Sequence, residues 1–262
     1  MDIIVCIKQV PGTAKVAVDE KTGVLLRLGV EAKLNPYDLY ALETAVQLKE
    51  AYGGTIRVIT MGPPQATEAV REAFALGADS GVMLTDMAFA GADTLATAYA
   101  LAGGINKSGG YDLIICGKQT TDGDTAQVGP SLAEFLDIPH MSNVVNISDL
   151  DSEKISVSAD LGDYIEAFEI KLPCTITVDK GIYVPRLPSY KRMLASAGQE
   201  ITMLGLRDLA DANPMMYGLN GSPTQVEKIY QPEAEAERVT IDGNPGEIAD
   251  KLHHELRVLK FL

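Results

Sequence analysis

The chain has 262 residues, 46% of them hydrophobic, and a formal net charge of −14. Its length and composition suit one large domain, or one domain with an extension, around a substantial core. The acidic balance excludes a nucleic-acid-binding protein, which needs clustered Lys and Arg against phosphate. The apolar runs are only strand-sized, and no charged leader precedes a long apolar stretch. We therefore expect a cytoplasmic protein with neither a signal peptide nor membrane insertion.

Cysteine and histidine give no metal site. The cysteines lie in separate apolar runs without CxxC spacing, which is typical of reduced core residues: Cys6, Cys116 and Cys174. We place His140 in a loop after Pro139. His253 and His254 are adjacent in an expected helix, where they do not share a face. We therefore expect neither zinc nor an iron–sulfur cluster.

Apolar strands alternate with helices over the first half of the chain. The expected strands are 3–7, 56–60, 82–85 and 113–116, and the expected helices are 37–52, 65–76, 93–106 and 125–136. Continuous apolar runs bounded by Gly, Pro or Asp are typical of buried parallel strands. The pattern predicts an open doubly wound, mainly parallel Rossmann-like α/β sheet. Asn35 can cap the first helix, Pro36 suits its first position, and Asp38 suits its positive end.

The second half changes character. Residues 155–161 and 164–172 flank Gly162-Asp163 and predict an antiparallel hairpin at one edge of the sheet, followed by a strand at 174–178. Beyond residue 180 the chain holds apolar islands among prolines and glycines, and a long irregular stretch is unusual inside a compact domain. We therefore expect a nucleotide-binding domain at 1–180 and a partner-wrapping extension at 181–262. The extension ends in a helix with one apolar stripe: Ile248, Leu252, Leu256 and Leu259.

A glycine-punctuated loop at 117–130 follows the strand 113–116. Such a loop aims backbone N–H groups beyond the carboxyl end of the strand, where open α/β sheets bind nucleotides. Gly117 and Gly123 permit close approach or positive φ, Thr125 can cap the next helix, and Gln127 can donate to phosphate or ribose. The alternative is an ordinary loop before a capped helix. No Walker or GxGxxG motif is present, so the binding mode is a less common one.

The pattern GKQ-x-x-DGDTAQVGP-x-LAE in this loop resembles the signature of the electron transfer flavoprotein (ETF) β subunit. The stretches IVCIKQVP at 4–11, NPYD at 35–38 and MGPP at 61–64 agree with it, and the collinear match covers essentially the whole chain. In that family these stretches together hold a nucleotide. The resemblance implies cofactor binding by Cys6, Asn35, Pro36, Tyr37, Asp38, Met61, Gly117, Lys118, Gln119, Asp122, Gly123, Asp124, Thr125, Ala126, Gln127 and Val128.

Alternatives stay open at several of these positions. Asn35-Pro36 alone is a helix cap, and Met61 alone is a core residue. Because carboxylates near a phosphate repel it, we favour backbone hydrogen bonding for Asp122 and Asp124, with ribose contact as a further role, over metal ligation or acid/base work.

A second candidate site lies at 91–97. Asp93 or Thr94 can cap a helix there, and the hydroxyls of Thr94 and Thr97 share one helix face. A plain capped helix is the alternative. In the bifurcating branch of the family, sequences resembling GGADTLATA and the later SPTQV (222–226) accompany a second flavin in place of AMP. This chain carries both, apart from Ala90 at the first Gly, so the resemblance favours FAD.

Residues 184–194 resemble the β-subunit recognition loop, in which a leucine before proline anchors in a hydrophobic pocket of the dehydrogenase. The matching residue is Leu187, and the alternative is a Pro-rich linker holding a core leucine. The lysine-rich continuation of many carriers is replaced by ASAGQ at 195–199. The dehydrogenase therefore need not be a typical acyl-CoA enzyme.

The resemblance implies the β subunit of a heterodimeric, electron-bifurcating ETF. It would bind FAD, accept electrons from NADH, and divide them between ferredoxin and the α-subunit flavin, which feeds an acyl-CoA or 2-hydroxyacid dehydrogenase. We expect no catalytic residue, because the flavin does the redox chemistry. The nearer alternative is a simple carrier subunit binding AMP. More distant alternatives are a stand-alone ATP-binding domain of the universal-stress type, whose Gly-x-x-Gly loop does not fit this sequence, and a ligand-free scaffold.

Overall fold

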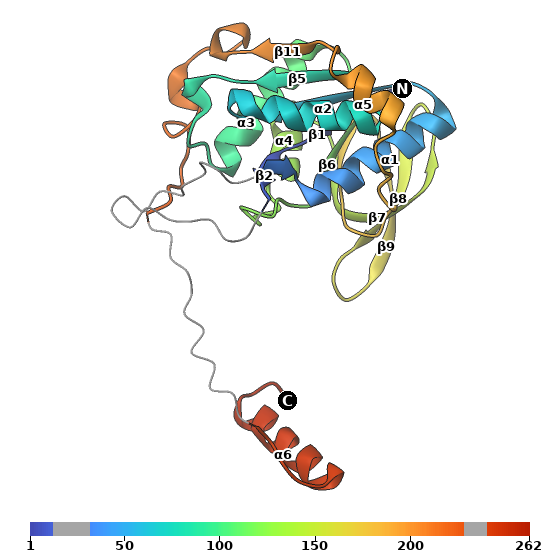
Figure 1. The fold of residues 1–262 in the computed structure, drawn as a ribbon, viewed down its shortest axis with the longest axis vertical. Helices are drawn as coiled ribbons and strands as arrows, with labels where there is room; N and C mark the ends of the chain where they lie inside the picture. The colour runs from blue at the N-terminus through green and yellow to red at the C-terminus, as the bar shows by residue number, and fades with distance from the viewer. Residues whose placement is uncertain (13–31, 228–239) are drawn as a thin grey trace. The chain divides into compact units, whose positions relative to one another are not determined.

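The computed structural model describes residues 1–12, 32–227 and 240–262. They form two compact units, one ending at Glu227 and one containing residues 240–262. The first unit is an α/β fold around a mixed nine-stranded sheet in the order β11-β5-β4-β1-β6-β10-β7-β8-β9 (Figure 1). Neighbours from β11 to β7 pair in parallel, and β8 and β9 add the antiparallel pairs.

The strands and helices of the first unit follow in chain order. They are β1 (Asp2–Cys6), β2 (Gln9–Pro11), β3 (Ala32–Leu34), α1 (Pro36–Tyr52), β4 (Thr55–Met61), η1 (Pro64–Ala66), α2 (Thr67–Leu76), β5 (Ser80–Leu84), η2 (Met87–Phe89), α3 (Thr94–Ser108), β6 (Leu113–Gly117), α4 (Val128–Leu136), β7 (His140–Leu150), β8 (Lys154–Asp160), β9 (Ile165–Lys171), β10 (Cys174–Val178), α5 (Tyr190–Ser196), β11 (Ile201–Leu204), η3 (Leu206–Asp208) and η4 (Pro214–Met216). β2 and β3 form a separate antiparallel pair.

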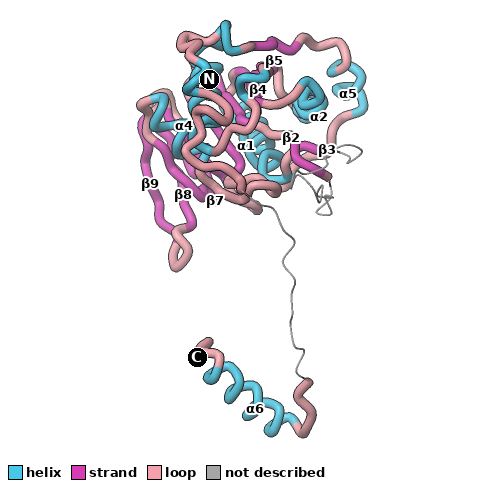
Figure 2. Tube along the Cα trace, turned by 90° about the vertical axis from the view of Figure 1, so that its left-hand side faces the viewer, coloured by secondary structure: helices cyan, strands magenta, loops and turns pink. Residues whose placement is uncertain are grey.

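Helices cover both faces of the large sheet, and the expected α/β fold with a mainly parallel sheet is confirmed. Successive side chains of β1 point to opposite faces. Ile3 joins a buried cluster with residues of α1 and α2, whereas Ile4 joins a second cluster with residues of α3 and α4. Figures 1 and 2 show the helix layers on the two sides. The central strands β1 and β6 are buried at all but one terminal residue, which is why their sequences read as apolar runs.

The predicted hairpin is confirmed as β8 and β9, with β9 at the edge of the sheet. The loop predicted at His140 is wrong, because His140 begins β7, which pairs with β10 and β8. β7 is mostly half-exposed and twice irregular in its register with β8, so its sequence lacks both a continuous apolar run and a clean alternation.

The chain beyond residue 180 holds regular elements that the sequence did not predict. α5 packs on α2, and β11 adds to the sheet in parallel beside β5. β11 has four residues, of which only Leu204 is buried, so it carries almost no apolar pattern. Residues 181–227 thus belong to the first compact unit, past the predicted boundary at 180. Partner wrapping by this region stays a prediction.

The second unit contains the predicted terminal helix, α6 (Pro245–Val258). Its start follows the sequence rules, because Asn244 and Glu247 form a reciprocal capping box and Pro245 occupies the first turn. Within this unit Leu252 and Leu259 are exposed, so docking of the apolar stripe stays a prediction. Across the two units, no described helix has the length and apolar character needed to span a membrane.

Candidate nucleotide site

The start of α1 is tied to the loop that follows β6. The fully buried side chain of Asn35 donates from Nδ2 to the carbonyl of Gln119 at 2.9 Å, and its Oδ1 accepts from the N–H of Thr121 at 3.2 Å. Asn35 occupies the N-cap position, but its side chain makes no capping bond, which corrects the expected role. Both of its polar atoms hold the loop instead.

Asp38 and Gly117 pack against one another beneath this loop. Asp38 Oδ2 accepts from the Lys8 N–H at 2.7 Å, and Oδ1 accepts from Asn35 Nδ2 at 2.9 Å. A Cβ on Gly117 would lie 2.5 Å from Asp38 Oδ1 and 2.7 Å from the backbone carbon of Tyr37. The predicted close approach at Gly117 is therefore present, between β6 and the start of α1.

Burial raises the pKa of Asp38 to about 7 from 3.8, although hydrogen bonds from Asn35 and the Lys8 N–H lower it. Because the folded pKa is raised, the stability from this group is fully present below about pH 4 and is lost as the pH rises to about 7. Between these two pH values, the free energy of unfolding should fall by about 1.4 kcal/mol per pH unit. We expect Asp38→Asn to remove this slope in urea unfolding of the chain at several pH values between about 4 and 8. The control is Asp163→Asn, in the exposed β8–β9 turn, whose free energy of unfolding should change with pH as that of the parent does. If Asp38→Asn also follows the parent at every pH, the buried carboxyl titrates normally and the prediction is wrong.

The loop between β6 and α4 presents unpaired backbone donors. Asp124 and Ala126 adopt left-handed φ values of 53° and 54°, so positive φ falls on these residues and not on Gly123. α4 starts at Val128, and the expected cap at Thr125 is wrong because the two left-handed residues carry the loop further before the helix begins. Within the described residues, no acceptor meets the N–H groups of residues 125–129.

The carboxylates of this loop are matched by donors. Lys8 Nζ contacts both oxygens of Asp122 at 2.9 and 2.8 Å, and Gln119 Nε2 donates to Asp124. Partial burial raises the pKa of Asp122, but hydrogen bonding and attraction from Lys8 hold it below its usual value. Lys118 pairs with Asp179 at 2.7 Å. Lys8 is a functional candidate that the sequence analysis did not single out, because a lone lysine after a strand carries no distinctive signal.

The start of α3 is joined to a segment some 130 residues later in the chain. Asp93 Oδ1 caps α3 by accepting from Leu95 and Ala96 at 3.0 and 3.1 Å, while Oδ2 accepts from the N–H and hydroxyl of Thr224 at 3.0 and 2.7 Å. The Asp93 N–H donates to Ser222 Oγ at 2.8 Å. We call these five bonds the Asp93 clasp. Of the two residues expected to cap this helix, Asp93 and Thr94, Asp93 is the cap.

The two candidate sites meet. Thr94 Oγ1 lies 3.2 Å from Gln127 Oε1, so the start of α3 touches the end of the 117–127 loop. Thr97 follows within the first turn of α3. The loop, the helix start and the Asp93 clasp are therefore continuous at the carboxyl side of β1 and β6.

Two expected site residues, Cys6 and Met61, lie in or against the hydrophobic core. Cys6 is buried in the core cluster that includes residues of α3 and α4, where a hydrogen bond with Cys116 and burial raise its pKa. Met61 packs against the same cluster, and Tyr37 is half-buried beside Gly117. Leu187 is 89% exposed, which is incompatible with its alternative role as a core leucine.

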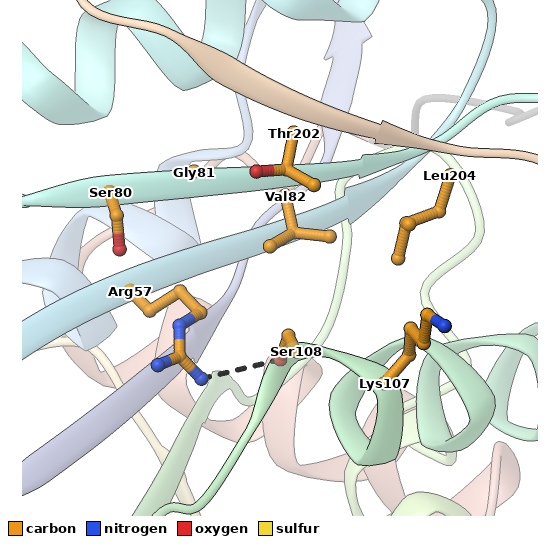
Figure 3. A pocket seen from close by; sticks show the side chains of 8 residues that line it. All are labelled: Arg57, Ser80, Gly81, Val82, Lys107, Ser108, Thr202 and Leu204. Atoms are coloured by element: carbon orange, nitrogen blue, oxygen red, sulfur yellow. Dashed lines mark hydrogen bonds between the residues drawn. The ribbon is translucent and has the colours of Figure 1, made fainter. Parts of the chain in front are cut away.

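Two cavities in the described chain lie away from these loops. One, of about 290 Å³, is lined by the first residues of β4 and β5, by β11 and by the last turn of α3 (Figure 3). Arg57 donates to Ser108 across it at 3.3 Å. The other, of about 280 Å³, lies beside Tyr99 and Tyr217. Neither contains a residue of the candidate nucleotide site.

An α/β sheet with polar loops gathered at its carboxyl edge is the architecture of nucleotide-binding proteins. A family model described as "Electron transfer flavoprotein domain" matches residues 22–206. Electron transfer flavoprotein subunit beta of Clostridium acetobutylicum is 44% identical over 92% of each chain. The caffeyl-CoA reductase-Etf complex subunit CarD of Acetobacterium woodii is 42% identical over 98% of each chain, and Protein FixA of Azorhizobium caulinodans is 40% identical over 98% of this chain and 94% of its own. The chain belongs to the ETF family, among its β subunits, as its motifs indicate.

Proposed function

We propose that this chain is the FAD-binding β subunit of an electron-bifurcating ETF. It works with an α subunit, takes electrons from NADH, and passes them to ferredoxin and, through the α-subunit flavin, to a partner dehydrogenase. The observation that carries this proposal is the Asp93 clasp, because it bonds together the two segments whose sequences resemble those accompanying a second flavin. The similarity to CarD, a subunit of a caffeyl-CoA reductase-Etf complex, supports a dehydrogenase-type partner.

The donor set fits the diphosphate of FAD. The N–H groups of residues 125–129 belong to the end of the loop and the first residues of α4, and the positive end of a helix favours an anion. The Thr97 hydroxyl adds a donor in the first turn of α3, and the Thr94 hydroxyl, which donates to Gln127, joins that turn to the loop. Lys8 balances Asp122, which lowers the repulsion that a bare carboxylate would exert on phosphate.

The chain's own residues bind and orient; FAD, when bound, supplies the electron-transfer chemistry. Asn35 holds the first part of the loop against α1 through two hydrogen bonds, so that part is fixed before a nucleotide arrives. The Asp93 clasp fixes the start of α3 in the same way. Preorganised donors lower the ordering cost of binding.

A carrier subunit binding AMP is the second candidate, because the loop donors alone suffice for a single phosphate. Denaturing the purified heterodimer and quantifying its released nucleotides separates the two. We expect two FAD per heterodimer and no AMP. One FAD and one AMP would show a simple carrier.

The same measurement tests the site. Thr125→Leu/Gln127→Leu replaces two exposed polar side chains of the loop, so we expect loss of one of the two FAD with the fold intact. Hydrogen bonds from these two side chains to the FAD phosphates would be charge-assisted, and such bonds contribute roughly 1.5–3 kcal/mol each. Thr202→Leu on β11 is the control, because it also makes an exposed threonine apolar. Full FAD content in the double variant would place the flavin elsewhere.

A further inference from the structure

The segment between β10 and β11 exposes several apolar side chains near Leu187 in the sequence. Leu187 and Val184 are each 89% exposed, and Tyr190 and Leu194 of α5 are exposed beside them in sequence. A loop that carries free apolar side chains gains nothing from its own packing, so its position depends on the contacts at its two ends.

The first end is held by Arg186, next to Leu187. Its Nε and Nη2 donate to the two carboxylate oxygens of Glu43 at 2.8 and 3.0 Å, and its backbone N–H donates to Glu43 Oε2 at 3.1 Å. Nη1 and Nη2 also donate to Glu50 at 2.7 and 3.1 Å. Glu43 and Glu50 are both on α1, so five hydrogen bonds fix this end to one helix.

Of the two glutamates that bind Arg186, Glu43 is the buried one. Its side chain is 3% exposed, against 54% for Glu50. Burial raises the pKa of Glu43, but the hydrogen bonds of Arg186 and Gln47 hold it below its usual value. A buried carboxylate that keeps its charge needs its cation, so Arg186 and Glu43 depend on one another more than Arg186 and Glu50 do.

The other end is held by α5. Ser189 caps α5 by accepting from the Arg192 N–H at 3.2 Å, and Arg71 of α2 donates to the carbonyls of Ser196 and Ala197 at 2.8 and 3.1 Å. Figures 1 and 2 both show α5 beside α2. Leu187 therefore lies between two fixed points, one on α1 and one on α2.

We propose that Arg186 is a positioning residue for partner docking: its forked ion pair with Glu43 and Glu50 holds the loop so that Leu187 stands ready to enter the dehydrogenase. This rests on the proposed function and on the expectation, from the resemblance to ETF β subunits, that Leu187 is the anchor in the dehydrogenase. An ordered loop docks without the entropy cost of fixing the Leu187 backbone and neighbouring side chains. Loss of the pair therefore weakens docking although no docking atom is removed.

The test uses the purified heterodimer with its dehydrogenase at limiting concentration. Arg186→Gln and Glu43→Gln should raise the KM for the dehydrogenase about tenfold with little change in kcat, since a tenfold change corresponds to about 1.4 kcal/mol of ordering cost. Arg186→Lys keeps the charge but loses the two-pronged hydrogen bonding of the guanidinium, so its KM should lie between those of the parent and Arg186→Gln. Glu50→Gln is the matched control on the same helix and should have a smaller effect, because Glu50 is half-exposed.

Two further readouts separate a positioning role from a general loss of structure. NADH-dependent reduction of an artificial dye, which does not need docking, should be unchanged in all variants. Amide hydrogen exchange at residues 184–194 of the free heterodimer should become faster in Arg186→Gln and Glu43→Gln but not in Leu187→Ala, since that variant keeps the ion pair.

Leu187→Ala is the reference that separates the two hypotheses. We expect its KM to rise at least tenfold with unchanged exchange, because it removes the anchor alone. If Leu187→Ala raises KM and Arg186→Gln does not, docking at Leu187 stands and the positioning role is overturned. If Leu187→Ala leaves KM unchanged, the anchor is wrong, and the positioning role falls with it even if exchange is faster in Arg186→Gln.

Discussion

Gly117→Ala is expected to weaken nucleotide binding strongly and to destabilise the fold. The new Cβ would lie 2.5 Å from Asp38 Oδ1, 2.7 Å from the Tyr37 backbone carbon and 2.8 Å from its carbonyl oxygen. Backbone cannot rotate away as a flexible side chain can, so β6 and the start of α1 must separate. Overpacking of this kind costs about 1–3 kcal/mol, and we expect the upper end of that range. Separation also breaks the bonds by which Asn35 holds the loop.

The measurement is FAD content of the purified heterodimer together with thermal unfolding. We expect FAD occupancy to fall by more than about tenfold, the equivalent of about 1.4 kcal/mol. Gly123→Ala is the matched control in the same loop, because its nearest neighbour is the Thr120 hydroxyl at 3.3 Å and its φ is not in the left-handed region. That variant should keep its FAD. Equal FAD content in both variants would show that the close approach at Gly117 does not shape the site.

The sequence predicts the strands best where both faces are buried. β1, β4 and β6 are central and covered by helices, so β1 and β6 read as apolar runs with clear ends and β4 does so apart from Arg57 and Thr60. β7 and β11 lie where burial is partial, and their residues carry no such run. The mainly parallel core of the sheet was therefore predictable, and the extension of the sheet past residue 180 was not.

The candidate site was predictable as a set of motifs but not as a network. The motifs come from the resemblance to ETF β subunits, and Gly117 could be singled out because a turn after a buried strand favours glycine. The bonds that join the motifs span 84 residues between Asn35 and Gln119 and 131 between Asp93 and Thr224. No periodicity encodes contacts at such separations. Thr125 failed as a cap because two non-glycine residues adopt positive φ just around it, which a sequence rarely reveals.

Asp93→Asn is expected to lower FAD affinity while α3 keeps its cap. Asparagine caps helices about as well as aspartate, so its Oδ1 can still accept from Leu95 and Ala96. Its NH2 group would face the N–H of Thr224, where the carboxylate now accepts two bonds, and the clasp would open. Hydrogen bonds to a charged group contribute about 1.5–3 kcal/mol each. We therefore expect FAD binding to weaken by about tenfold or more.

Asp86→Asn provides the matched control because Asp86 uses its carboxylate in the same way. One oxygen caps η2 through Ala88, and the other accepts from Leu206, far along the chain. Both variants should lose comparable thermal stability, but only Asp93→Asn should lose FAD in equilibrium dialysis. Thr224→Val removes the hydroxyl alone, so its FAD affinity should lie between those of Asp93→Asn and the parent. If Asp93→Asn and Asp86→Asn bind FAD equally well, the clasp supports the fold and not a flavin, and the case for FAD over AMP in this subunit loses its main structural support.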